Sequence, residues 1–128
     1  NPNPNPNPNP NPNPNPNMFT GGLDALKGCM ALQGLGLGGN LLTGGLEALA
    51  GFTVLQGLSL AGNQLSGGLD ALEGCRYLHG VDCRGNELTG TLEPLRGCKD
   101  LQELRLRTNH PTGPNPNPIS PNFTLTLP

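Results

Sequence analysis

Ser59, His79 and Asp82 are the residue types of a hydrolytic triad, in which a hydroxyl attacks, an imidazole accepts its proton and a carboxylate orients the imidazole. Such a set also needs a pocket for the substrate and donors for an oxyanion. These residues fall on or beside short alternating segments, which predict a flat strand face and indicate neither feature. We therefore interpret the set as a coincidence and expect no enzyme.

The four cysteines resemble a framework but are better interpreted as core residues. Cys29, Cys75 and Cys98 fall at the repeat position that Phe52 fills, and Cys83 falls at that of a strand leucine. We expect all four to point inward, where free Cys packs as a small hydrophobe. None has metal-ligand spacing, so no metal or other cofactor is expected. Cys75 and Cys98 lie at equivalent positions of adjacent repeats, so a disulfide between them is the alternative.

Charged residues gather at outward positions of the C-terminal repeats. They alternate with apolar residues, so we expect them on one face of the predicted strands. This face is either a contact for a ligand or another subunit, or a solvated surface that keeps the sheet soluble. Its members are Asp82, Arg84, Glu103, Arg105 and Arg107.

The elements that position these residues are set by a 23-residue repeat. An asparagine recurs at this spacing, and the text around it nearly repeats, as in LQGLGLGGNLLTGGLEAL and LQGLSLAGNQLSGGLDAL. A repeat of this length predicts a solenoid, in which each unit buries its apolar face only against its neighbours. The asparagines are Asn17, Asn40, Asn63, Asn86 and Asn109.

Each repeat predicts a short strand, a corner and a helical turn. Residues 35–37, 58–60, 81–83 and 104–106 alternate inward and outward, which predicts a parallel sheet. We expect each asparagine side chain to bond the backbone of its own coil and of the next. The Leu-[Ser/Thr]-Gly segments then turn the corner. On the return side, an acid near the start and a glycine near the end favour short helical turns. The fold class is therefore α/β.

These units resemble the leucine-rich repeat family, most closely its plant and algal extracellular subclass, whose units read LxxLxxLxLxxNxLxGxIP. The resemblance covers about three quarters of the chain. The units are one residue shorter, Leu-[Asp/Glu] replaces Ile-Pro, and the paired-cysteine caps of many members are missing. The resemblance implies a right-handed curved solenoid of four 23-residue coils that binds proteins or polysaccharide, and it does not imply an enzyme.

Proline-rich segments flank the solenoid. Residues 1–16 are Asn-Pro units, 17–113 carry the repeats, and 114–128 form a Pro-rich tail with a terminal strand. Alternate prolines exclude helix and spoil a sheet ladder, so the tract predicts a polyproline II rod of roughly 50 Å. The bland interpretation is a linker. The tracts also resemble plant and algal hydroxyproline-rich wall proteins, which implies hydroxylated and O-glycosylated prolines. The candidates are Pro2, Pro4, Pro6, Pro8, Pro10, Pro12, Pro14, Pro16, Pro114, Pro116 and Pro118.

Asn122 heads an N-glycosylation sequon, which is used only in a secreted protein. Residues 122–127 alternate as a strand does and belong to no repeat. Adding this strand to another copy would give a head-to-tail contact and so a filament. With no initiator Met and no signal peptide, we expect a mature product or a fragment.

Composition narrows the partners. Charged residues make up 12% of the chain, the net charge is -2 and aromatics are 3%. Nucleic acid is therefore not expected as a partner, and no apolar run is long enough to span a membrane. We favour a structural extracellular or cell-surface glycoprotein that self-assembles as a homo-oligomer or filament. The alternative is a recognition module that binds a protein or polysaccharide. A repeat antigen on a parasite surface is a minor third reading.

Overall fold

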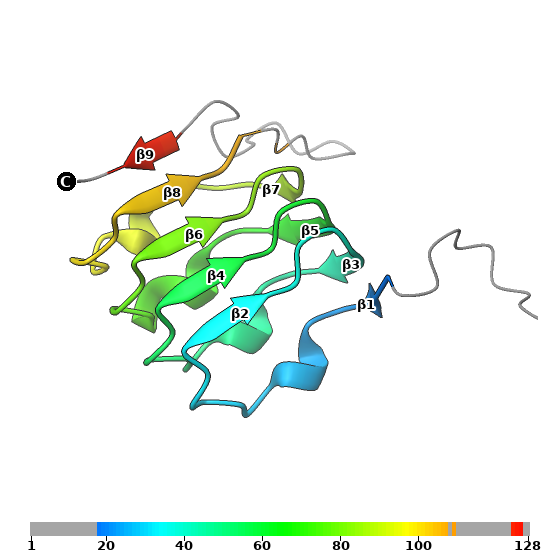
Figure 1. The fold of residues 1–128 in the computed structure, drawn as a ribbon, viewed down its shortest axis with the longest axis horizontal. Helices are drawn as coiled ribbons and strands as arrows, with labels where there is room; N and C mark the ends of the chain where they lie inside the picture. The colour runs from blue at the N-terminus through cyan, green and yellow to red at the C-terminus, as the bar shows by residue number, and fades with distance from the viewer. Residues whose placement is uncertain (1–17, 108, 110–123, 127–128) are drawn as a thin grey trace, which may run out of the picture.

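The computed structural model describes residues 18–107, 109 and 124–126 (Figure 1). The Asn-Pro tract, Asn17, the tail prolines and the Asn122 sequon lie outside these residues, so the expectations for them stay predictions. The described chain winds into stacked coils. Successive coils contribute strands to two sheets, with a short helix on the return side.

The larger sheet has the strand order β2-β4-β6-β8-β9. Its repeat strands are parallel and in register: β2 (Gly34–Gly36), β4 (Gly57–Ser59), β6 (Gly80–Asp82) and β8 (Glu103–Arg105). The predicted parallel strands are thus confirmed, although each begins one residue earlier than expected. The last strand, β9 (Thr124–Thr126), pairs antiparallel with β8 of the same chain (Figure 1). The expected addition of this strand to another copy is therefore wrong for the structure, because β8 lies within reach in the same chain.

A second sheet occupies the segments that were expected to be simple corners. It has the order β1-β3-β5-β7, and its strands are β1 (Thr20–Gly21), β3 (Leu41–Gly44), β5 (Gln64–Gly67) and β7 (Glu87–Leu88). Gly44, Gly67 and Gly90 have the left-handed φ of a turn, as corner positions require, but the residues before them also run extended beside their neighbours, which was not predicted. Gly44 pairs with Leu65 and Ser66 with Glu87, which stacks one corner on the next as a parallel ladder.

Four 3₁₀ helices form the return side, as the expected short helical turns: η1 (Asp24–Leu26), η2 (Glu47–Leu49), η3 (Asp70–Gly74) and η4 (Glu93–Leu95). An acid begins each of them, beside the positive end of the helix dipole. Only Gly28 (φ 94°) and Gly51 (φ 92°) adopt the left-handed conformation expected of the capping glycines. None of these helical turns is long or apolar enough to cross a membrane.

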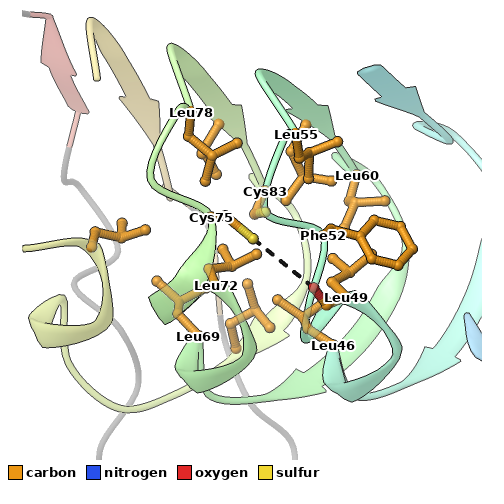
Figure 2. Packing of buried hydrophobic residues seen from close by; sticks show 14 of the residues in the cluster. Leu46, Leu49, Phe52, Leu55, Leu60, Leu69, Leu72, Cys75, Leu78 and Cys83 are labelled. Atoms are coloured by element: carbon orange, nitrogen blue, oxygen red, sulfur yellow. Dashed lines mark hydrogen bonds between the residues drawn. The ribbon is translucent and has the colours of Figure 1, made fainter. Parts of the chain in front are cut away.

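The core lies between the two sheets and the helical side, where leucines of successive coils stack (Figure 2). Phe52, at 0% exposure, fills the middle of the stack. The inward direction expected of the cysteines is confirmed for Cys75, Cys83 and Cys98 and is wrong for Cys29, which is exposed. Cys29 belongs to the first coil, whose N-terminal side packs against no other described coil.

All four cysteines are free thiols in the structure, so the alternative disulfide between Cys75 and Cys98 is not formed there. Instead, Cys98 Sγ donates to the carbonyl of Cys75 at 3.3 Å. Burial raises the pKa of Cys75 to about 11 and that of Cys83 to about 12, and it also raises the pKa of Cys98. These thiols are therefore inert at neutral pH.

Candidate ligand-binding groove

Asparagine side chains hold the ends of the larger sheet's strands in place. Asn63 Nδ2 donates at 3.0 Å both to the Leu60 carbonyl of its own coil and to the Leu37 carbonyl of the preceding coil. Its Oδ1 accepts from the backbone N–H of Leu42 at 3.0 Å. One side chain thus satisfies three backbone groups in two coils. The expected bonding between coils is confirmed, but it reaches the preceding coil, whereas the next coil was expected.

The same pattern recurs along the described stack. Asn86 and Asn109 repeat all of these bonds one and two coils further on. Asn40 makes the bonds to its own coil and accepts from Phe19 N–H. No buried side-chain nitrogen or oxygen of the described residues lacks a hydrogen-bond partner. The sheet is therefore a rigid platform for whatever lies on it.

An open groove of about 580 Å³ runs across the outer face of strands β2, β4, β6 and β8. We call it the sheet groove. Its floor is nearly bare, because Gly34, Gly57 and Gly80 stand in register on neighbouring strands and Gly36 lies beside Ser59. Asp82 and Glu103 line its C-terminal end. The N-terminal end of the groove is thus open because its floor is glycine, and the C-terminal end carries two carboxylates.

The first of these carboxylates is held by an arginine two residues further on. Asp82 accepts from Arg84 Nε at 2.9 Å and from Nη2 at 2.8 Å, which is a bidentate pair. This hydrogen bonding lowers the pKa of the Asp82 carboxyl and raises the pKa of Arg84. Both groups are therefore ionised at neutral pH.

Arg105 forms the second pair, with Glu103. The structure thus brings together four of the five charged residues expected on this face as two neighbouring ion pairs. The fifth, Arg107, is exposed beyond the end of β8, and its carbonyl accepts from Gly85 N–H at 3.1 Å. Four of the five residues thus form two pairs of opposite charge on the outer face of the sheet, and a binding or assembly role for them stays a prediction.

The hydrolytic residue types also fall near this groove. Ser59 and Asp82 are register partners on β4 and β6, and His79 immediately precedes β6. The Asp82 carboxylate is engaged by Arg84, so it is not available to orient an imidazole. Among the described residues, no group of three His, Cys, Asp or Glu side chains could hold a metal ion.

The sequence indicated the charged wall of the groove and the bare glycine at Gly36, but the column of glycines that completes the floor was not predicted. The signal was present, because a glycine recurs before the first strand leucine at Gly34, Gly57 and Gly80. Repeat periodicity was assigned from the apolar side chains, and a glycine that recurs at one repeat position contributes no side chain to that pattern.

No family model and no curated protein sequence matches the chain, whereas solved structures do match it. One is the leucine-rich repeat ectodomain of the membrane receptor kinase GASSHO1/SCHENGEN3 from Arabidopsis thaliana, in complex with CASPARIAN STRIP INTEGRITY FACTOR 2. It aligns with a TM-score of 0.66 and 27% identity, over 71% of this chain and 11% of that chain.

A second is the plant peptide hormone receptor RGFR1 in complex with RGF2, with a TM-score of 0.65 and 27% identity, over 70% of this chain and 15% of that chain. The ectodomain of the receptor kinase SOBIR1 from Arabidopsis thaliana aligns with a TM-score of 0.64 and 22% identity, over 73% of this chain and 54% of that chain. The chain therefore spans only part of the length of each, and it has the leucine-rich repeat fold of plant receptor ectodomains.

Proposed function

We propose that this leucine-rich repeat domain is an extracellular recognition module that binds a protein or peptide segment in the sheet groove. The groove itself carries the proposal, because it joins an open floor to a wall of ion-paired charges on a rigid sheet. Two structural neighbours were solved with a bound factor or hormone, and their likeness to this chain supports the choice.

The groove favours binding over chemistry. Solenoid faces offer extended surfaces on which a partner can lie across several coils. The wall of the groove consists of two ion pairs, Asp82–Arg84 and Glu103–Arg105. Because each pair is neutral overall, it distinguishes partners by the positions of their hydrogen-bond donors and acceptors and not by their net charge. A role as fibre subunit, which the sequence favoured first, stays a prediction without such support. The pairing of β9 with β8 removes the strand addition on which the filament depended.

Selection from a displayed library of random dodecapeptides tests the proposal. Peptides that bind the immobilised chain are synthesised, and their affinity in solution is measured by calorimetry. Reversing both Arg105 and Arg107 to Glu should weaken binding at least about tenfold, because the Glu103–Arg105 pair is broken and the charge of the patch is reversed at two positions.

Two further variants sharpen the result. Gly57→Trp fills the groove floor, and a Cβ at Gly57 meets no atom within 4 Å, so the fold should persist while binding is lost. Arg96→Glu is the matched control, because Arg96 also pairs with a glutamate, Glu93, but lies at η4 on the other side. Peptides that bind all variants equally, or a library that yields none, would contradict the proposal.

A further inference from the structure

The N-terminal side of the first coil is an apolar face that no described segment covers. Four leucines there are only half-buried, namely Leu26, Leu32, Leu35 and Leu37. Their equivalents one repeat later are at most 2% exposed, namely Leu49, Leu55, Leu58 and Leu60. At these four positions every later coil has a buried residue, and the first coil presents the same surface uncovered.

This face is hollowed and carries a large exposed apolar side chain. A hollow of about 220 Å³ opens among Phe19, Leu23, Leu26 and Leu37. Phe19 is 59% exposed. Contiguous apolar surface of this kind marks a protein–protein contact.

The two edges of the larger sheet are guarded unequally. At one edge, Pro128 follows β9 closely in the sequence, and a proline beside an edge strand discourages further pairing. At the other edge, β2 carries no charge and no proline between Gly34 and Gly36. No other described strand pairs with the outer edge of β2, so this edge is open to another strand, directly beside the uncovered leucines.

The sequence of this chain decides between two occupants. The preceding tract has no Leu, Ile, Val or Phe in residues 1–17, and its alternate prolines cannot donate to a strand ladder. A second copy offers both a leucine face and a free strand. It also offers matching charge, because Asp24 and Lys27 are exposed on and just after η1 and are self-complementary under two-fold symmetry.

We propose that this N-terminal face is the interface of a symmetric dimer. A two-fold axis running from the sheet side to the helix side pairs β2 antiparallel with β2 of the second copy. The same axis sets η1 against η1 with opposite direction, so that Asp24 meets Lys27 of the second copy and the reverse. The interface is isologous and closed, so it gives dimers and not fibres.

Sedimentation of the full chain between 1 and 100 μM, a range of roughly two decades around typical transient dimer affinities, tests the proposal. The wild type should be dimeric at the upper end. Lys27→Asp should weaken the dimer at least about tenfold by opposing two carboxylates across the axis, and the swap Asp24→Lys with Lys27→Asp should restore it. Glu47→Lys, at the matching position of η2, is the control and should change nothing.

The remaining outcomes would each overturn the proposal. A monomer at every concentration, both in the full chain and after deletion of residues 1–17, would show that the face binds no second copy. A monomeric full chain that dimerises only after this deletion would identify the Asn-Pro tract as the cover. Assembly that grows beyond the dimer would exclude a closed interface. Thermal melting confirms that each variant is folded.

Discussion

Asn86 donates a hydrogen bond of 2.9 Å to the carbonyl of Leu60, a residue that belongs to the coil before its own. The same amide nitrogen also bonds Cys83 of its own coil, and the amide oxygen accepts from Leu65 N–H at 3.0 Å. A single neutral side chain thereby replaces water for backbone groups of two coils. The described coils are held together by polar bonds of this kind in addition to leucine packing.

Replacing Asn86 with Ala should lower the free energy of unfolding by about 2–4 kcal/mol, because buried backbone groups lose their partners. Asn40→Ala is the matched control. Asn40 lies in the ladder's first described rung and is half-exposed, so water can replace its bonds and the loss should be roughly half as large. Urea unfolding measures both. Equal losses would show that burial does not strengthen these bonds.

Thiol labelling should separate Cys29 from the other cysteines. In the native protein at pH 8, N-ethylmaleimide should modify Cys29 readily because it is exposed. Cys75 should react at least about 100-fold more slowly, because burial both blocks access and raises its pKa to about 11. Mass spectrometry of digested protein gives the rates, and denaturant should abolish the difference. Fast modification of native Cys75 would show that the coils open readily.

The Asp82–Arg84 pair should give a small, pH-dependent contribution to stability. The pair lowers the pKa of Asp82, so its contribution is present above the ordinary carboxyl pKa of about 3.9 and is lost as the pH falls below it. Because the pair is partly exposed, Asp82→Asn should cost under about 1 kcal/mol at pH 7. The difference between wild type and variant should vanish near pH 2, as measured by urea unfolding. Asp100→Asn, at an exposed position, is the control.

Removing β9 should expose the edge of β8. A chain ending before Thr124 loses the antiparallel partner of Glu103 and Arg105 and leaves a free strand at the C-terminal end of the sheet. The truncated chain should then associate through the exposed edge of β8, and light scattering at micromolar concentration should show larger particles than for the full chain. Charge reversal of Lys27 isolates this effect from contacts at the other end. Unchanged association would mean that β9 does not protect β8.

The repeat in the sequence was sufficient for the parallel strands, the helical turns and the asparagine bonds, because each follows from one residue type at one spacing. It was not sufficient for β1, β3, β5 and β7. Their pairing depends on the register between neighbouring coils, in which Gly44 lies opposite Leu65. The sequence of a single repeat does not specify that register. The inward position of Cys29 failed for a related reason: burial at the end of a stack depends on what covers it.

The candidate groove was half predictable. Asp82 and Glu103 predicted a charged face, because the alternation of residues along a strand shows which positions face outward. Their pairing with Arg84 and Arg105 depends on side-chain rotamers, which the sequence does not encode separately. The open floor needed the register of three glycines on three strands.

The direction of the asparagine bonds gives the chain a temporal order. The Leu42 N–H and the Leu37 carbonyl have their hydrogen-bond partner only after Asn63 has been synthesised. The Leu65 N–H likewise needs Asn86. Since proteins are synthesised from the N-terminus, a nascent coil stays incomplete until the following asparagine has left the ribosome. Folding during synthesis should therefore advance in steps of one repeat, with one unfinished coil always at the growing end.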